Sequence, residues 1–185
     1  FAWAWDMGRP ERSSEPGPGE TYTPGTPNSW SVMSVDEELG LVYVPTGNAT
    51  PDYHSGHRST QMDRYSSSVV ALDGSTGRPR WAFQTVHRDL WDYDVGSQPV
   101  LVDLADGRPA LIQPTKRGEL FLLDRRTGDP IAPVAERKVP VSTVAGERAS
   151  ATQPFSIGMP SFAGPRPSEK SMWGLLMLDQ AWCRL

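Results

Sequence analysis

Three carboxylates lie close together in one short segment, His87-Arg88-Asp89-Leu90-Trp91-Asp92-Tyr93-Asp94. A carboxylate within hydrogen-bond reach of a substrate hydroxyl can remove the hydroxyl proton as a general base. Taken alone, however, three acidic residues crowded on one loop favour a solvated acidic turn.

Three further side chains have chemistry that a site could use, each beside an ordinary structural explanation. Asn48 follows Gly47, and its amide carbonyl is a ligand that hard divalent cations accept, although Gly-Asn turns are common. Lys116 could stabilise negative charge that develops on a bound group, or it could be a hairpin lysine beside the equally basic Arg117. Trp30 offers an aromatic face for stacking, or it could fill a protein interface.

The remaining candidates for metal or thiol chemistry are weaker. His54 and His57 are three residues apart in a polar stretch, and we expect them to be exposed to solvent rather than to bind a metal. Cys183 is the single cysteine, which excludes an internal disulfide and a cysteine-cluster metal site; we expect it to be buried.

Composition limits what these residues can belong to. The 185 residues carry a formal charge of −4, so they lack the basic character typical of proteins that bind nucleic acid. No apolar run approaches the roughly 20 residues needed to span a bilayer. The chain starts at Phe1 without a methionine and ends abruptly, so we interpret residues 1–185 as a fragment of a single larger domain that contains no complete domain boundary.

The elements that must position these side chains are short strands. The sequence holds 17 Gly and 18 Pro, well above the usual share of each, which favours many turns over long helices. Short runs rich in β-branched and aromatic residues, bounded by turn residues, predict six strands at residues 39–45, 68–72, 80–85, 98–104, 109–113 and 119–123. Three long stretches without such a pattern are predicted to be loops, namely residues 11–27, 48–65 and 132–167.

A repeated motif predicts the architecture. Asp73, Thr76-Gly77 and Trp81 follow one predicted strand, and Asp124 and Thr127-Gly128 follow another at the same spacing, with Ala132 in place of the tryptophan. Trp3 lies in a setting similar to that of Trp81 and could end an earlier copy. A period of about 50 residues containing strands, a turn and a tryptophan is typical of β-propeller blades.

This repeat resembles the tryptophan-docking motif of the eight-bladed quinoprotein dehydrogenases, which hold pyrroloquinoline quinone (PQQ). The resemblance extends along nearly the whole chain and is closest to the membrane-bound glucose and quinate dehydrogenase type. It is carried by the segment around Asp92 and by Thr26-Pro27-Asn28-Ser29-Trp30, Gly47-Asn48-Ala49-Thr50-Pro51-Asp52, Thr115-Lys116-Arg117-Gly118, Thr152-Gln153-Pro154-Phe155-Ser156, Met172-Trp173-Gly174 and Asp179-Gln180. It implies an all-β fold, a partial propeller of about three blades.

The resemblance also implies roles for individual residues. Asp92 matches the family's catalytic base, and the neighbouring Trp91 would fix it and exclude water. Asn48 matches a ligand of the divalent metal ion, Ca²⁺ or Mg²⁺, and Trp30 the floor on which PQQ stacks. Lys116 would contact the quinone oxygens. We further expect His87 to brace the loop that carries Asp92.

The implied function is oxidation of a sugar or cyclic polyol such as glucose, with hydride transfer to PQQ and electrons passed to ubiquinone. Quinate, shikimate or another polyol is the alternative substrate, and a carboxylate-bearing substrate such as quinate would need a basic partner. Candidates for that partner are Arg58, Arg64 and Arg88, each of which could equally be a surface charge.

An alternative of another class is a non-enzymatic scaffold, because outer-membrane assembly lipoproteins carry the same repeats. For the enzyme, the resemblance implies a location on the periplasmic side of the bacterial inner membrane, anchored by segments that this chain lacks. The isolated chain is expected to be inactive.

Overall fold

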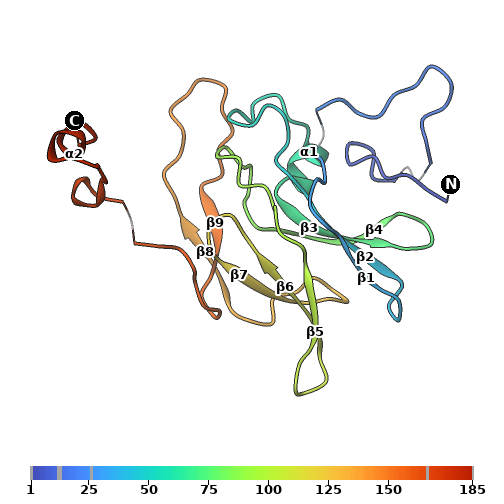
Figure 1. The fold of residues 1–185 in the computed structure, drawn as a ribbon. Coiled ribbons are helices and arrows are strands. Elements are labelled where there is room, and N and C mark those ends of the chain that lie inside the picture. The colour runs from blue at the N-terminus through green and yellow to red at the C-terminus, as the bar shows by residue number, and fades with distance from the viewer. Residues whose placement is uncertain (1, 12–13, 26, 166, 185) are drawn as a thin grey trace.

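The computed structural model describes residues 2–11, 14–25, 27–165 and 167–184, and within them the chain forms three antiparallel sheets. The sheets follow one another along the sequence and stand side by side (Figure 1). The predicted all-β class is therefore confirmed, and each sheet corresponds to a complete or partial blade.

The first sheet has four strands in the order β1-β2-β3-β4. Their bounds are Ser34–Asp36 for β1, Leu41–Pro45 for β2, Ser68–Asp73 for β3 and Pro79–Gln84 for β4. The last three match predicted strands. The first is only three residues long, too short for a periodic pattern to reveal it.

The second sheet has the order β5-β6-β7, with bounds Val100–Asp103, Pro109–Pro114 and Leu120–Asp124, and all three strands were predicted. The third is the hairpin of β8 and β9, Val134–Lys138 and Thr152–Ser156. Both strands lie inside the stretch 132–167, so the prediction of a loop there was wrong over these residues.

Helices are short. The helix α1 has six residues, Thr60–Tyr65, and Ser59 caps its N-terminus by accepting a hydrogen bond from the Met62 N–H at 3.2 Å. The predicted loop 48–65 is therefore helical at its end. Near the C-terminus lie the 3₁₀ turn η1, Glu169–Ser171, and α2, Met177–Trp182.

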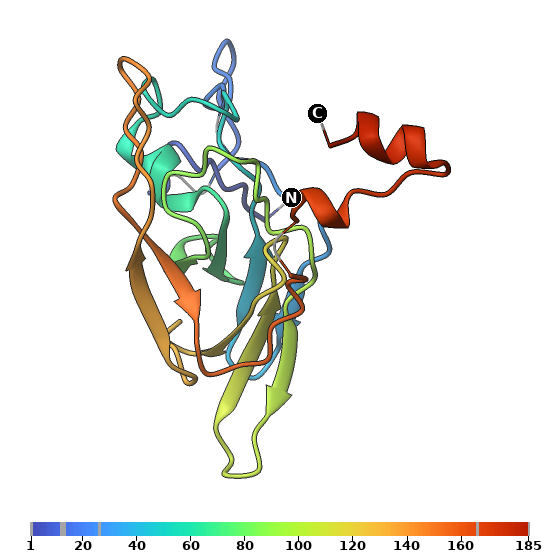
Figure 2. The ribbon, with the colours of Figure 1, turned by 90° about the vertical axis from the view of Figure 1, so that its left-hand side faces the viewer.

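Two other expectations concern the chain ends. Within the predicted loop 11–27, the structure describes turns and irregular chain, and residues 12, 13 and 26 lie outside the described ranges. The segment containing α2 stands apart from the sheets (Figures 1 and 2), and the expectation that Cys183 is buried was wrong, because its side chain is exposed there. None of the helices described is long and apolar enough to cross a membrane.

The main core lies between the first two sheets. Tyr43 and Val69 of the first sheet are fully buried with Leu111 and Phe121 of the second. The ring of Phe83 lies 5.1 Å from that of Phe121, centroid to centroid. Burial of these large apolar side chains fixes the two blades against each other.

The tryptophan repeat joins each blade to the next. The Trp81 indole N–H donates to the Arg125 carbonyl at 3.2 Å, and its ring covers Gly128, where an added Cβ would lie 2.6 Å from Cε3. Trp3 makes the same contacts one copy earlier, donating to the Gly74 carbonyl at 2.9 Å and covering Gly77. The prediction that Trp3 ends an earlier copy is therefore confirmed.

Candidate active site

Loops from separate elements bring the predicted site residues together at one end of the sheets. Trp30 precedes β1, Asn48 follows β2, Asp92 lies between β4 and β5, and Lys116 is in the turn between β6 and β7. Each is on a connection rather than inside a strand, so the packed blades provide the rigid support for the site.

Lys116 is at the centre of this cluster. Its Nζ donates to the Asp92 carbonyl at 2.8 Å and to Oδ2 of Asp94 at 2.9 Å, and it lies 3.7 Å from Oδ2 of Asp92. The same Nζ is 5.9 Å from the centroid of the Trp30 ring. Lys116 therefore connects the proposed base to the proposed stacking platform.

Asp94 is a member of the cluster that sequence reasoning missed. Its Oδ1 accepts a hydrogen bond from the Asn48 backbone N–H at 2.6 Å, while Oδ2 accepts from Lys116. A Cβ at Gly47 would lie 2.9 Å from that Oδ1, so a residue without a side chain is needed for the Asp94 carboxylate to lie this close to the backbone at position 47. The spacing of Asp92 and Asp94 was the available signal, but it does not show which carboxylate is exposed.

The charges in the cluster shift its acid–base equilibria. Partial burial and the negative charge of Asp94 raise the pKa of Asp92, against the opposing charge of Lys116. Although burial opposes ionisation of Asp94, the hydrogen bonds from Asn48 and Lys116 lower its pKa. Partial burial likewise opposes protonation of Lys116, but its bond to Asp94 outweighs this and raises the Lys116 pKa. Of the two carboxylates, Asp94 is thus the one that loses its proton more readily, and Asp92 is the one that is easier to protonate.

Trp30 and Lys116 fit a flat, anionic cofactor. The Trp30 side chain is 58% exposed, unusual for a large aromatic residue whose ring also contacts backbone. It lies against Gly96, where an added Cβ would come within 2.8 Å of Cη2. An exposed indole face beside an ammonium group suits an electron-poor ring that carries negative charge.

Asn48 supplies one part of a possible metal site. Its side chain is buried, its Oδ1 accepts from the Ser66 hydroxyl at 3.0 Å, and its Nδ2 donates to the Asp52 carbonyl at 2.8 Å. A carbonyl oxygen has two lone pairs, so Oδ1 keeps one acceptor position. The described residues hold no group of three or more His, Cys, Asp or Glu side chains able to bind a metal; Asn48 would thus be one ligand of a larger set.

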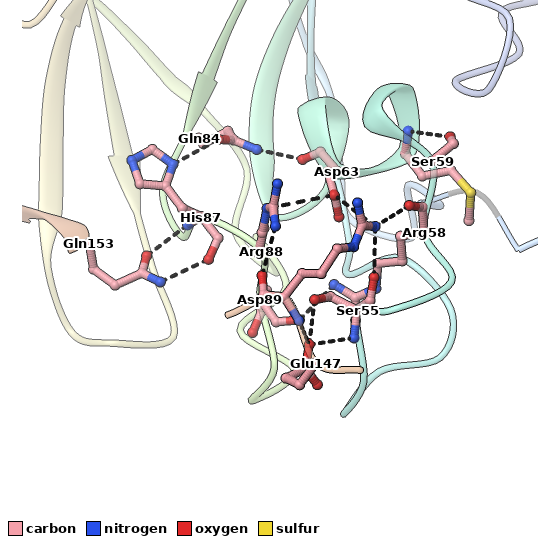
Figure 3. A network of polar contacts seen from close by, with 12 residues as sticks. Ser55, Arg58, Ser59, Asp63, Gln84, His87, Arg88, Asp89, Glu147 and Gln153 are labelled. Carbon is pink, nitrogen blue, oxygen red and sulfur yellow. Dashed lines mark hydrogen bonds and ion pairs between the residues drawn. The ribbon is translucent and has the colours of Figure 1, made fainter. Parts of the chain in front are cut away.

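A buried carboxylate, that of Asp89, holds the loop that carries Asp92. Asp89 is fully buried and accepts three hydrogen bonds: from the Trp91 N–H at 2.8 Å, the Tyr93 N–H at 2.6 Å and the Ser67 hydroxyl at 2.6 Å. The Asp89 carbonyl accepts from the Arg58 guanidinium at 2.7 Å (Figure 3). Sequence reasoning weighed Asp89 only as part of a crowded acidic turn.

The arginines considered from the sequence make structural contacts. Arg117 forms an ion pair with Glu119 at 2.8 Å and stacks on Phe155, with 4.4 Å from its Cζ to the ring centroid. Its contacts therefore join two blades, whereas Lys116 contacts Asp92 and Asp94. Arg58 is buried and donates to the Asp89, Pro51 and Asp52 carbonyls. The idea that Arg58 could be a surface charge was therefore wrong.

Arg64 and Arg88 make their contacts with residues outside the cluster. The Arg64 guanidinium lies 5.5 Å from the Tyr65 ring centroid, and Arg88 donates to the Arg148 carbonyl at 3.0 Å and pairs with Asp63 at 3.8 Å. Among the contacts of the described residues, Arg58, Arg64 and Arg88 make none with Asp92 or Lys116.

His87 and His57 have the positions expected of them, whereas His54 is less exposed than expected. The His87 N–H donates to the Gln153 side chain at 2.7 Å and the His87 carbonyl accepts from it at 2.8 Å, so His87 ties the start of the Asp92 loop to β9. His57 is exposed and His54 half-buried, and their ring centroids are 5.5 Å apart.

Comparisons with known proteins place this chain in a family. A family model described as "PQQ: Glucose/ethanol/alcohol dehydrogenase, beta-propeller domain" matches residues 1–185. The glycerol dehydrogenase large subunit of Gluconobacter oxydans (strain 621H) is 54% identical over 190 residues, covering 100% of this chain and 26% of that protein. Quinoprotein glucose dehydrogenase A of Acinetobacter calcoaceticus is 43% identical over 192 residues, covering 99% of this chain and 24% of that protein.

A solved structure agrees with the fold. The quinohemoprotein alcohol dehydrogenase from Comamonas testosteroni matches 72% of this chain and 20% of its own, with a TM-score of 0.54 and 34% sequence identity. The chain spans about a quarter of the length of the curated relatives named above. With a family model matched along its whole length, the chain belongs to the family of PQQ-dependent glucose, ethanol and alcohol dehydrogenases and forms part of their β-propeller domain.

Proposed function

We propose that the protein to which this chain belongs oxidises an alcohol group of a sugar or polyol, with Asp92 as general base. The observation that carries this proposal is the cluster in which Lys116 contacts both Asp92 and Asp94 beside the exposed face of Trp30. A pure scaffold has no need for an exposed carboxylate held against an ammonium group that also lies beside an exposed indole.

Each residue has a distinct task in this proposal. The Asp92 side chain is 38% exposed, so its carboxylate can reach a substrate hydroxyl and accept its proton. PQQ, when bound, supplies the hydride acceptor and the route of electrons to ubiquinone. Trp30 would stack against the cofactor, and Lys116 would place positive charge where negative charge develops. Asn48 would give one oxygen ligand to Ca²⁺ or Mg²⁺.

We favour a neutral polyhydroxy substrate. The arginines that could have paired with a substrate carboxylate contact carbonyls, Asp63 or an aromatic ring instead. The relatives with 54% and 43% identity are named for glycerol and glucose, both of which are uncharged. Quinate and shikimate remain the alternative, with a carboxylate partner from another part of the propeller.

We also place the parent protein at the periplasmic face of the inner membrane, where ubiquinone is within reach.

The experiment uses the full-length parent protein reconstituted with PQQ and either Ca²⁺ or Mg²⁺. Dye reduction is measured with glycerol, glucose, quinate and shikimate, for the parent and for Asp92→Asn. We expect activity on a neutral substrate that Asp92→Asn lowers by about 10²- to 10⁴-fold, the usual contribution of general base catalysis, while PQQ stays bound.

Other outcomes would revise the proposal in distinct ways. Activity that survives Asp92→Asn would keep the enzyme but remove Asp92 as the base. If the parent neither binds PQQ nor reduces the dye, the result favours the alternative of a non-enzymatic scaffold. The tryptophan repeats alone would also build such a scaffold.

A further inference from the structure

We propose that Asp89 is the positioning residue for Asp92: its buried carboxylate holds the two peptide N–H groups on either side of Asp92 and thereby aims the base. This inference rests on the proposed function, in which Asp92 accepts the substrate proton. Asp89 itself is fully buried, so it acts through the loop and not on the substrate.

The backbone of Asp92 needs such a restraint. Its φ is +60°, in the left-handed region that residues with a Cβ rarely adopt. An unfavourable backbone conformation persists only where its surroundings determine it. Here the surroundings are the two oxygens of Asp89, because Oδ1 binds the Trp91 N–H and Oδ2 binds the Tyr93 N–H.

Asp89 also fixes the loop relative to the turn that carries Asn48. Oδ2 of Asp89 accepts from the hydroxyl of Ser67, whose own N–H donates to the Gly47 carbonyl at 3.0 Å. On the other side, the Arg58 guanidinium donates to the Asp89 carbonyl and, at 3.1 Å, to the Asp52 carbonyl, which also accepts from the Asn48 side chain. The position of Asp92 relative to Asn48 therefore depends on Asp89 and its partners.

A carboxylate is needed for this geometry, and an amide of the same shape cannot replace it. Three donors point at the two oxygens of Asp89. An asparagine offers one oxygen and one NH₂ group, which is a donor. If its oxygen faces Trp91, the NH₂ group faces the Tyr93 N–H; if it is turned around, the NH₂ group faces the Trp91 N–H. Either orientation leaves one N–H beside Asp92 without an acceptor and lets the loop shift.

The test is Asp89→Asn in the full-length PQQ-loaded parent protein, with glycerol and glucose as substrates. A displacement of about 1 Å in a catalytic group can cost about 100-fold in rate. We therefore expect kcat to fall about 100-fold, with KM and PQQ affinity close to those of the parent, because Asp89 touches neither the substrate nor the proposed cofactor residues.

Asp63→Asn is the matched control. Asp63 is a buried carboxylate in the same polar network, facing Arg148 at 3.5 Å and Arg88 at 3.8 Å, and the structure gives it no bond to residues 91–93. Loss of its charge should lower thermal stability and leave kcat near the parent value. Asp89→Ser is the second variant if Asp89→Asn does not fold, since a serine hydroxyl can keep one bond of such a turn but cannot bind both N–H groups.

A double-mutant cycle separates positioning from general damage. If Asp89 acts only through Asp92, adding Asp89→Asn to Asp92→Asn should lower the residual rate no further. Parent-like kcat in Asp89→Asn, an equal loss of kcat in Asp63→Asn, or additive losses in the double variant would each overturn the positioning role. Activity that survives Asp92→Asn would overturn it together with the base, whereas loss in Asp92→Asn but not in Asp89→Asn would leave the proposed function intact.

Discussion

The charges around Lys116 set the acid–base behaviour of Asp92. A general base must be ionised, and burial together with the charge of Asp94 raises the pKa of Asp92 above its ordinary value. The acid limb of the kcat/KM profile should therefore lie at a higher pH than an isolated aspartate would give. In its ionised form Asp92 would also be a stronger base, which suits removal of an alcohol proton.

Replacement of Asp94 by asparagine tests this coupling. Removal of one negative charge favours ionisation of Asp92, so we expect the acid limb of kcat/KM in Asp94→Asn to move to lower pH. Asp106→Asn is the control, because Asp106 is an exposed carboxylate paired with Arg108 in the β5–β6 hairpin. An acid limb that stays in place or moves to higher pH would contradict the coupling.

Lys116 and Arg117 are neighbours with opposite expected phenotypes. Lys116→Ala removes the ammonium of the cluster and should reduce turnover and PQQ affinity with little change in stability. Arg117→Ala leaves Glu119 buried without its partner, which costs about 3 kcal/mol of unfolding free energy. Thermal melting and PQQ titration of both variants of the parent protein measure the two effects; equal melting temperatures would contradict this assignment.

At the scale of elements, the docked tryptophan is the joint between blades. Trp81 comes from β4 and covers Gly128, which follows β7, and Gly128 has a φ of +79°. The Asp124 carboxylate stabilises the same turn by accepting from the Arg126 N–H at 2.8 Å. The joint therefore requires an aromatic ring on one blade and a residue without a side chain on the next.

Gly128→Ala should cost more stability than a glycine substitution in an open turn. Gly107 has nearly the same backbone, with φ of +81°, and nothing within 4 Å of an added Cβ. Both variants cost about 1 to 2 kcal/mol for the left-handed backbone, and Gly128→Ala adds about 1 to 3 kcal/mol for overlap with the Trp81 ring. Denaturant unfolding of the parent protein gives both values, and equal losses would show that the docking contact does not contribute.

Predicted and unpredicted strands differ in the contacts that stabilise them. The six predicted strands carry apolar side chains that pack in the core. In β8, Val134 packs against the core, but Glu136, Arg137 and Lys138 are exposed, so the strand lacks a periodic apolar pattern. It also pairs with β9, where Arg137 lies 5.2 Å from the Phe155 ring centroid.

At the scale of the whole molecule, the site is open on the side of Trp30. The chain spans about a quarter of its curated relatives, and cofactor sites normally enclose most of the ligand surface. We expect the isolated 185-residue chain to show no saturable PQQ binding and no turnover. Tryptophan fluorescence titration with PQQ, alongside the full-length protein, is the measurement, and saturation of the isolated chain would contradict this expectation.

The sequence by itself determined the fold class, the tryptophan repeat and four candidate site residues. The repeat can be recognised because it places Asp, Thr-Gly and Trp at fixed local spacing, and Trp30, Asn48, Asp92 and Lys116 lie in recognisable segments. The roles of these four residues stay predictions until the variants are measured.

Only the tertiary structure decided which side chains act together. Asp89 and Asp94 are the same residue type, five positions apart in one segment. Asp94 nevertheless contacts Lys116 and the Asn48 N–H, whereas Asp89 is buried against Ser67. Likewise, Lys116 faces the cluster and Arg117 faces Glu119. The direction of a side chain on a loop is set by contacts with residues distant in sequence, and no local spacing specifies it.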